Sequence, residues 1–366
     1  MIYNDIRRKS REVTVGRIKI GGKNKIAIQS MTNTDTLDEF ATLSQVRALA
    51  SAGCDIVRIT VPTPEAAKTI YRIKEEGICV PIVADIHFDY HSALEAVECG
   101  VDKIRINPGN IGSQDRIKAV VDACRNRNIP IRIGVNSGSV EKHILEKYNS
   151  PTPEALCESA MYHVSMLEQF DFNDIVISIK ASNVYDMIKA NRRVAERCDY
   201  PIHLGVTEAG GESMGTIKSA AGIGSALCDG IGDTFRISLT DDPVKEVAAA
   251  TNLLNALCIE GQCGMNIVSC PTCGRTKINL IALSKEFEDV MRKEGLIDFP
   301  VKVALMGCIV NGPGEAREAD IGIAGGQGEA VLISRGEIIR KIKEEEIISV
   351  LCEEIKKIKK EKEKNV

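Results

Sequence analysis

The sequence contains no tryptophan, and aromatic residues make up only 4% of its 366 positions. Stacked aromatic side chains are the usual platform for unpaired bases, so their scarcity argues against a protein that binds single-stranded nucleic acid. Charge points the same way, because 51 acidic residues against 47 basic ones give a formal net charge of -4. No nucleic-acid partner is therefore expected, although local basic pockets are compatible with this total.

Long apolar runs are also missing. No stretch reaches the roughly 18 residues of a membrane-spanning helix, and the opening MIYNDIRRKSREVTVG lacks the apolar segment of a secretory signal. We therefore expect no membrane association and a cytoplasmic location. In that compartment the 13 cysteines are not a disulfide framework. Most are expected to be small buried apolar residues, and only a clustered subset should carry chemistry.

Histidine is absent after His203, the last of five. A zinc knuckle of the Cys/His kind is therefore excluded from the C-terminal part of the chain. The same absence removes a second candidate, the segment GESMG at 211–215, which matches the G-x-S-x-G pattern of a nucleophile elbow. Such an elbow needs a histidine later in the chain, and none follows.

What the chain does contain is a repeated unit of short apolar strand, polar loop and amphipathic helix, from about residue 26 to 240. Strands that alternate with helices favour parallel pairing, and eight such units in this length predict a (β/α)8 TIM-type barrel. A doubly wound sheet is the second choice, because periodicity alone does not exclude it. The expected strands are residues 25–29, 55–61, 81–86, 102–107, 130–136, 174–180, 201–207 and 233–239.

The pattern changes near residue 262. A helix over 277–295, a strand over 301–307 and a Gly/Pro loop over 308–320 predict a small α+β domain. The tail from residue 337 is expected to be helical, because charges of opposite sign recur four positions apart. The predicted domains are therefore the barrel, 1–262, and an α+β domain with a C-terminal helix, 263–366.

The cysteines that should carry chemistry are Cys270 and Cys273, which form a Cys-x-x-Cys pair, and Cys308 in the same domain. An iron–sulfur site, a structural zinc site and a redox dithiol all remain open. A dithiol would leave Cys308 without a role, and zinc on four thiolates would have to recruit Cys263 or Cys352. An iron–sulfur site is the favoured interpretation.

A candidate fourth ligand follows Cys308 in the segment NGPGE, which ends in Glu315. Its glycines and proline favour a tight turn that could return the carboxylate to a metal. The same letters also fit an ordinary turn with an exposed glutamate. A carboxylate suits an iron that must be vacated for a substrate better than it suits a permanently ligated one.

Chemistry in such barrels collects at the C-terminal ends of the strands, and here those ends are strongly polar. Five strands each carry a cation, which is more than salt bridges in the barrel floor require. Converging cations suit phosphate or diphosphate, and the acids Asp85 and Glu208 are expected to act in general acid–base catalysis. The expected substrate-binding residues are Arg58, Arg105, Asn107, Arg132, Asn136, Lys180, Arg236 and Ser238.

Four segments, VRIT, HLGVTEAGG, CPTCGR and MGCIVNGPGEA, together carry a family resemblance. The chain resembles the 4-hydroxy-3-methylbut-2-enyl diphosphate synthases of the non-mevalonate isoprenoid pathway, in their two-domain bacterial form. The resemblance spans nearly the whole chain, and none of these motifs departs from the family pattern.

This resemblance implies a [4Fe–4S] cluster held by Cys270, Cys273, Cys308 and Glu315. It implies reductive opening of 2-C-methyl-D-erythritol 2,4-cyclodiphosphate, with two electrons from a donor such as flavodoxin or ferredoxin. The expected catalytic residues are Glu208, Glu315 and Asp85. The resemblance further implies a head-to-tail homodimer. The competing hypothesis is a phosphate-binding lyase or transferase barrel with a structural zinc domain, similar to pteroate synthases.

Overall fold

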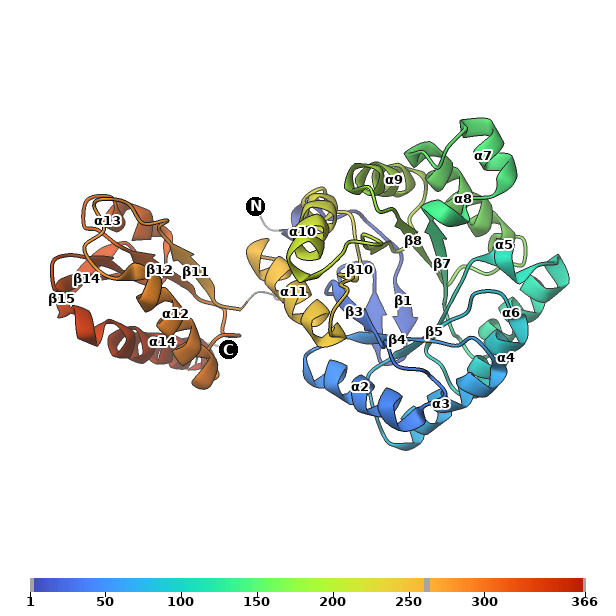
Figure 1. The fold of residues 1–366 in the computed structure, drawn as a ribbon, viewed down its shortest axis with the longest axis horizontal. Helices are drawn as coiled ribbons and strands as arrows, with labels where there is room; N and C mark the ends of the chain where they lie inside the picture. The colour runs from blue at the N-terminus through green and yellow to red at the C-terminus, as the bar shows by residue number, and fades with distance from the viewer. Residues whose placement is uncertain (1–2, 260–263, 365–366) are drawn as a thin grey trace. The chain divides into compact units, whose positions relative to one another are not determined.

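The computed structural model describes residues 3–259 and 264–364. The chain divides into two compact units, Met1–Leu253 and Leu254–Val366, and each is described by itself (Figure 1). The domain boundary expected between residues 262 and 263, and the alternative ligand Cys263, lie outside the described residues.

The first unit is a barrel of eight parallel strands, as predicted (Figure 1). The hydrogen-bonded order is β8-β7-β6-β5-β4-β3-β10-β9, and a parallel bridge between Ile177 and Ile202 brings the two ends of this sheet together. The strands are β3 (Ala27–Met31), β4 (Ile56–Thr60), β5 (Ile82–Asp85), β6 (Lys103–Ile106), β7 (Ile131–Asn136), β8 (Ile175–Lys180), β9 (His203–Leu204) and β10 (Thr234–Phe235).

Helices follow the strands and cover the outside of the barrel (Figure 1). Two of them begin at a capping threonine followed by proline: Thr63 accepts from the amide of Ala66, and Thr152 accepts from the amide of Ala155. The helices are α1 (Tyr3–Ile6), α2 (Glu39–Ser51), α3 (Pro64–Glu75), α4 (Tyr90–Glu98), α5 (Pro108–Ile111), α6 (Gln114–Asn126), α7 (Lys142–Tyr148), α8 (Pro153–Glu168), α9 (Val184–Arg197), α10 (Glu212–Cys228) and α11 (Pro243–Ala256).

A short antiparallel hairpin precedes the barrel, β1 (Val13–Val15) and β2 (Ile18–Ile20). The sequence patterns above did not predict it. Its buried side chains join one apolar cluster with residues at the N-terminal ends of four barrel strands, Ala27, Ile56, Val83 and Val176. An apolar cluster therefore fills much of this end of the barrel, and the polar cavity lies at the opposite end.

The second unit is built on a five-stranded mixed sheet in sequential order, β11 to β15. One face packs on α12 and α14 through a buried apolar cluster, and the other face packs on the segment that contains Ala316 and Ala319. The elements are β11 (Asn266–Ser269), α12 (Leu280–Lys293), β12 (Lys302–Met306), α13 (Gly312–Glu315), β13 (Ile321–Gly325), β14 (Glu329–Ser334), β15 (Glu337–Lys343) and α14 (Ile347–Lys364).

The prediction that the tail is helical from residue 337 is wrong for its first seven residues. Glu337–Lys343 forms strand β15, which pairs antiparallel with β14. Arg335 and Gly336 both have positive φ, 48° and 85°, which is the backbone of a two-residue hairpin turn. The turn reverses the chain before the helix begins at Ile347. None of the helices in the described part of the chain is both long and apolar enough to cross a membrane.

Candidate active site

A polar cavity of about 120 Å³ lies at the C-terminal ends of the barrel strands. Its lining contains six of the predicted site residues and adds three side chains that were not assigned to the site. The lining residues are Arg58, Asp85, His87, Arg105, Arg132, Asn136, Ser178, Lys180 and Thr207.

Strand register explains why these side chains meet. Asp85 of β5 lies beside Arg105 of β6, Arg105 lies beside Arg132 of β7, and Asn136 of β7 lies beside Lys180 of β8. Alternate residues of a strand point to the same side, so the positions between these polar residues, such as Ile104 and Ile133, pack outward and are fully buried. The alternation seen in the sequence thus aims the polar set into the barrel.

Two inward-facing glycines make room for the long cations. A Cβ at Gly134 would overlap the guanidinium of Arg105, and a Cβ at Gly205 would lie 2.8 Å from Nζ of Lys180. Gly134 lies within β7 and Gly205 directly follows β9, and at both positions a Cβ would meet a cation of the cavity. Because these two residues have no side chain, Arg105 and Lys180 can occupy the space beside them.

Asp85 is the single carboxylate in the cavity lining. Its Oδ1 accepts from Arg105 at 3.1 Å, and its Oδ2 lies 3.8 Å from Nε of Arg58. Burial raises the pKa of Asp85, but Arg58, Arg105, His87 and Arg132 outweigh that effect and hold the pKa at about 2. Asp85 is thus a carboxylate at neutral pH, which favours a role in holding the arginines over a role as proton donor.

The cavity lining contains more cations than carboxylates, and burial destabilises the charged form of these cations. Burial lowers the pKa of Arg58 to about 10, and the pKa values of Arg132 and Lys180 lie well below their usual range for the same reason. Neighbouring guanidinium groups add to the effect. Nε and Nη1 of Arg132 are buried without a hydrogen-bond partner among the described residues. An anion placed here would satisfy these donors and relieve the repulsion.

Arg58 has only a weak partner on its free side. Its Nε and Nη2 donate to the thioether sulfur of Met31 at 3.0 and 2.8 Å. Thioether sulfur is a poor acceptor, so an incoming phosphate oxygen would replace it with a stronger one. Arg58 is the member of the set that is best prepared to exchange its contact for a substrate.

Arg236 is held differently from the other cations. It donates through Nε and Nη2 to both oxygens of Glu246, at 2.9 and 2.8 Å, and Glu246 is only 2% exposed. Its charge is therefore largely matched within the protein. The sequence did not identify Glu246, because the pairing of a helix glutamate with an arginine ten positions earlier cannot be predicted from spacing alone.

The three remaining predicted barrel residues do not line the cavity. Asn107 is buried and caps α5 by accepting from the amide of Gly109 at 3.1 Å, and Ser238 is half-buried. Glu208 is exposed and follows the lining residue Thr207. Its φ of 54° is uncommon for a residue with a Cβ, and such conformations cluster at functional sites.

A second cavity, of about 180 Å³, lies in the C-terminal unit. It gathers all four predicted metal ligands, Cys270, Cys273, Cys308 and Glu315. The cysteines come from the end of β11, the loop after it and the end of β12, and Glu315 ends the short helix α13. Cys352, the described alternative for a fourth thiolate, lies in the apolar core of the unit and does not line this cavity.

Backbone N–H groups surround the three sulfur atoms. The amide of Gly307 donates to Sγ of Cys270 at 3.3 Å, and the amide of Arg275 donates to Sγ of Cys273 at 3.5 Å. Hydrogen bonds of this kind stabilise thiolates and tune iron–sulfur clusters.

Cys308 is surrounded by backbone donors as well. The backbone N–H groups of Asn311 and Val310 lower the pKa of its thiol, and Gly312 and Arg275 contribute further. A lowered pKa favours the thiolate, the form that binds metal.

The chemistry of the donor set bears on which metal group it fits. Among residues 3–259 and 264–364, no three His, Cys, Asp or Glu side chains converge closely enough to hold a single metal ion. A four-iron cluster distributes its ligands over separate ions, so they surround a cavity instead of a point. Three thiolates with N–H donors and one carboxylate around a cavity fit that group.

Two models of known protein families match this chain, one over the barrel and one over the cysteine-bearing unit. The GcpE TIM-barrel domain matches residues 10–251, and the GcpE protein C-terminal domain matches residues 266–357. The chain belongs to the GcpE family. The two matches cover most of its length and assign the barrel and the cysteine-bearing unit to the same kind of protein.

Full-length relatives in this family are similar along nearly the whole chain. A 4-hydroxy-3-methylbut-2-en-1-yl diphosphate synthase (flavodoxin) from Fusobacterium nucleatum is 54% identical over 351 residues, 96% of this chain and 97% of that protein. The protein of the same name from Clostridium perfringens is 54% identical over 352 residues, 96% of this chain and 99% of that protein.

Solved structures add support for the fold alone. A dihydropteroate synthase from Xanthomonas albilineans covers 69% of this GcpE chain and 99% of its own, with a TM-score of 0.50 and 12% identity. The HPPK-DHPS of Plasmodium falciparum covers 77% of this chain and 52% of its own, with a TM-score of 0.51 and 12% identity. At this identity the likeness shows a shared barrel and nothing about chemistry.

Proposed function

We propose that this chain is a 4-hydroxy-3-methylbut-2-en-1-yl diphosphate synthase that opens the ring of 2-C-methyl-D-erythritol 2,4-cyclodiphosphate. The observation that carries the proposal is the cavity lined by Cys270, Cys273, Cys308 and Glu315, in a chain of the GcpE family. The relatives with 54% identity are synthases of that name, which supports the same activity here. A zinc-bearing lyase or transferase has no comparable support.

The reaction needs two electrons and a proton source. The bond between carbon and one phosphate oxygen of the ring breaks, the diphosphate stays on the other carbon, and a hydroxyl group leaves as water after protonation. When bound, the [4Fe–4S] cluster supplies electrons one at a time. Substrate binding, substrate orientation and protonation of the leaving hydroxyl depend on the side chains of the two units.

The barrel residues bind and orient the substrate. Arg58, Arg105, Arg132 and Lys180 face one carboxylate, so the cavity carries a surplus of positive charge for the diphosphate. Fixing the phosphates fixes the carbon skeleton, and the same cations stabilise the negative charge on the phosphate oxygen released as the ring opens. Asp85 keeps Arg58 and Arg105 in place for this task. Asn107, Asn136, Arg236 and Ser238 complete the proposed substrate-binding set.

Glu208 is the proposed proton donor for the departing hydroxyl. It follows Thr207, which lines the cavity, and its exposed side chain is free to reach a substrate. Glu315 is the proposed fourth ligand of the cluster, and it lies with the three cysteines. A carboxylate is a weaker ligand for iron than a thiolate, so this position can be given up to a substrate.

A homodimer is part of the proposal, since the two cavities lie in different units and each reaction needs both. Mixing Glu208→Gln protein with Cys270→Ala protein tests whether two chains share a site. Activity recovered after confirmed subunit exchange would support a shared site, because one mixed site holds both intact parts. Exchange without recovery would mean that each chain completes its own site.

The proposed function is tested on anaerobically purified protein reconstituted with iron and sulfide. It should be brown, and reduced methyl viologen should drive conversion of the cyclodiphosphate into 4-hydroxy-3-methylbut-2-enyl diphosphate with release of one water. A colourless protein that retains zinc and gives no product after reconstitution would overturn the proposal.

A further inference from the structure

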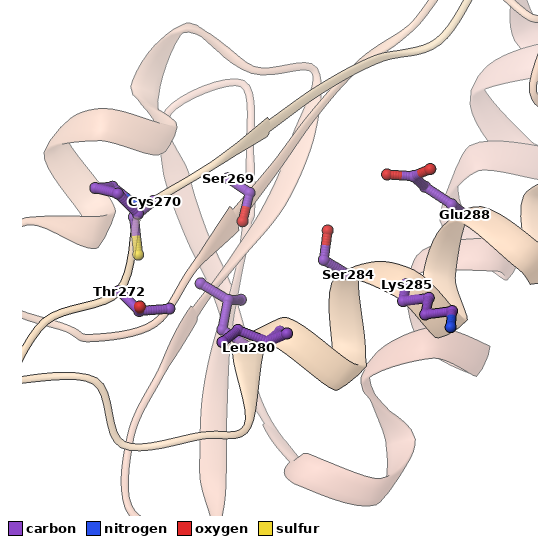
Figure 2. A pocket seen from close by; sticks show the side chains of 9 residues that line it. Ser269, Cys270, Thr272, Leu280, Ser284, Lys285 and Glu288 are labelled. Atoms are coloured by element: carbon purple, nitrogen blue, oxygen red, sulfur yellow. The ribbon is translucent and has the colours of Figure 1, made fainter. Parts of the chain in front are cut away.

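A groove of about 420 Å³ lies beside the cluster cavity, between the Cys-x-x-Cys loop and helix α12. Figure 2 shows its two walls: Ser269, Cys270 and Thr272 come from the end of β11 and the loop, and Ser284, Lys285 and Glu288 extend from α12. Pro271, Leu280 and Ile281 complete the lining. The substrate chemistry described above uses none of the α12 residues.

The groove and the cluster cavity share one wall. Cys270, Pro271 and Thr272 line both, whereas Cys308 and Glu315 line the cavity alone. A molecule in the groove would therefore contact Cys270, one of the proposed cluster ligands, without covering Glu315. The proposed function would bring the substrate to the Glu315 side of the cavity, and the groove would give an electron donor a separate approach.

The segment that leads from the Cys-x-x-Cys loop into α12 is basic, although the groove lining itself holds one base, Lys285, and one acid. From Ser269 to Lys285 the chain carries Arg275, Lys277 and Lys285 and no acidic residue. Helix α12 also begins here, capped by Asn279, so the positive end of its dipole adds to the field. Glu288 is the one acid in the lining. This distribution favours a partner with an acidic surface.

The groove also offers an apolar contact that nothing in its own unit covers. Ile281 is 74% exposed although it lies in the first turn of the helix. Lys285 lies one turn further along the same face and makes no ion pair with another described residue. An exposed isoleucine beside a free lysine is typical of a protein–protein contact that combines apolar burial with charge steering.

We propose that this groove is the docking surface for the electron donor, a small acidic flavoprotein of the flavodoxin type that presents its flavin to the Cys270–Thr272 wall. The inference rests on the proposed function for the identity of the acceptor. The relatives carry the word flavodoxin in their names, and the basic segment from Ser269 to Lys285 favours an acidic partner. Each docking event passes one electron from the reduced flavin to the cluster, so two events supply the two electrons of one turnover.

The test uses Ile281→Glu and Lys285→Glu in the full-length, cluster-loaded protein. Neither change removes a buried contact, because both side chains are exposed. Matched controls from the same unit are Ile339→Glu, an exposed isoleucine on β15, and Lys360→Glu, an exposed lysine on α14. Iron content and thermal unfolding are measured for all four variants.

The first readout is affinity for a purified, oxidised bacterial flavodoxin, which requires no turnover. Each groove variant should bind at least tenfold more weakly than wild type, the double variant more weakly still, and both controls should bind like wild type. Wild-type affinity should fall as salt is raised from 50 to 300 mM, and Lys285→Glu should reduce that dependence. The second readout is the ratio of flavodoxin-driven to viologen-driven turnover, which should fall at least tenfold in the groove variants.

Unchanged affinity in both groove variants would overturn the docking proposal, and so would a loss that appears equally in the controls. A change of oligomeric state without a change in flavodoxin affinity would assign the groove to a contact between copies of this chain, which also overturns it. The two proposals fail separately. If wild type binds flavodoxin but makes no product with either reductant, the proposed function is wrong and the docking surface stands.

Discussion

The guanidinium of Arg105 lies over Gly134, in the space that a β-carbon would take. Arg105 also donates to Asp85 and to the backbone carbonyl of Gly134 itself, at 3.1 and 3.3 Å. The absence of one methyl group therefore fixes where a cation of the cavity lies. Gly205 has the same relationship to Lys180.

Gly134→Ala should displace Arg105 from Asp85 without unfolding the barrel. Losing one charge-assisted contact to the substrate should weaken binding by about 1.5–3 kcal/mol, or roughly 10- to 150-fold in KM at nearly unchanged iron content. The control is Gly138→Ala, because an added Cβ at Gly138 meets nothing within 4 Å. Steady-state kinetics for both variants check this prediction, and an equal loss of affinity in Gly138→Ala would contradict it.

Substrate binding should depend on pH through Lys180. Burial lowers the pKa of this ammonium well below 10.5, and Arg58, Arg236, Arg132 and Arg105 lower it further. Below that lowered pKa the ammonium is charged and binds the diphosphate; as pH rises through it, the charge and the affinity are lost. A bound anion raises the pKa again, so binding near the lowered pKa should take up protons.

Calorimetric titrations in buffers of different ionisation enthalpy measure that proton uptake directly. Lys180→Met should abolish the share of uptake that belongs to Lys180 and should weaken binding at neutral pH. Identical uptake in wild type and Lys180→Met would show that Lys180 does not change its protonation on binding, which contradicts the prediction.

Much of the barrel could be predicted from the sequence, because each strand combines an apolar outer row with flanking turn residues. The inward set of Arg58, Arg105 and Lys180 follows from the same alternation. The contacts of Arg105 with Gly134 and of Lys180 with Gly205 could not be predicted, since the sequence does not show which side chain will lie against a given glycine. The hairpin at Val13–Ile20 was missed because two three-residue strands carry almost no periodic signal.

The cysteine-bearing unit was predictable in a different way. The spacing of Cys270 and Cys273 favoured a metal site, but spacing alone does not bring Cys308 and Glu315 to the same cavity. The paired strands β11 and β12 do so, because Ser269 lies beside Leu305 in the parallel register and the two strands end together. The segment Glu337–Lys343 was misassigned because its charge pattern fits a helix as well as an edge strand.

Glu208→Gln should lower the turnover number by about 10²- to 10⁴-fold, the usual contribution of a general acid. Substrate affinity should be nearly unchanged, because the proposed role begins only when the hydroxyl departs. Glu208→Gly should lose activity in the same way but should not lose stability, because glycine adopts the left-handed backbone at φ 54° without strain. Single-turnover kinetics and chemical unfolding test the two parts. Full activity in Glu208→Gln would exclude the proton-donor role.

Lys103 is fully buried below the cavity, and its Nζ has no hydrogen-bond partner among the described residues. Burial lowers the pKa of this amine well below 10.5, so folding penalises the charged form of Lys103 relative to the unfolded chain. That cost fades as pH rises toward the unfolded pKa of about 10.4. Lys103→Met should therefore stabilise the barrel by about 1–3 kcal/mol at pH 7, and less at pH 10.

Denaturant-induced unfolding at the two pH values measures this gain. The exposed Lys68→Met is the control and should change stability by less than about 0.5 kcal/mol. Destabilisation by Lys103→Met would reveal a compensating contact for Nζ that the described residues do not provide.

We propose that Glu315 completes the cluster site as a ligand that can be given up. Turnover and iron content of Glu315→Cys test it most directly. A thiolate at this position should keep or increase the iron content, because it binds iron more firmly than a carboxylate. The same variant should lose most of its viologen-driven conversion of the cyclodiphosphate, because the fourth position no longer opens. A Glu315→Cys protein with full iron and full turnover would contradict the account and leave Glu315 as an exposed residue of an ordinary turn.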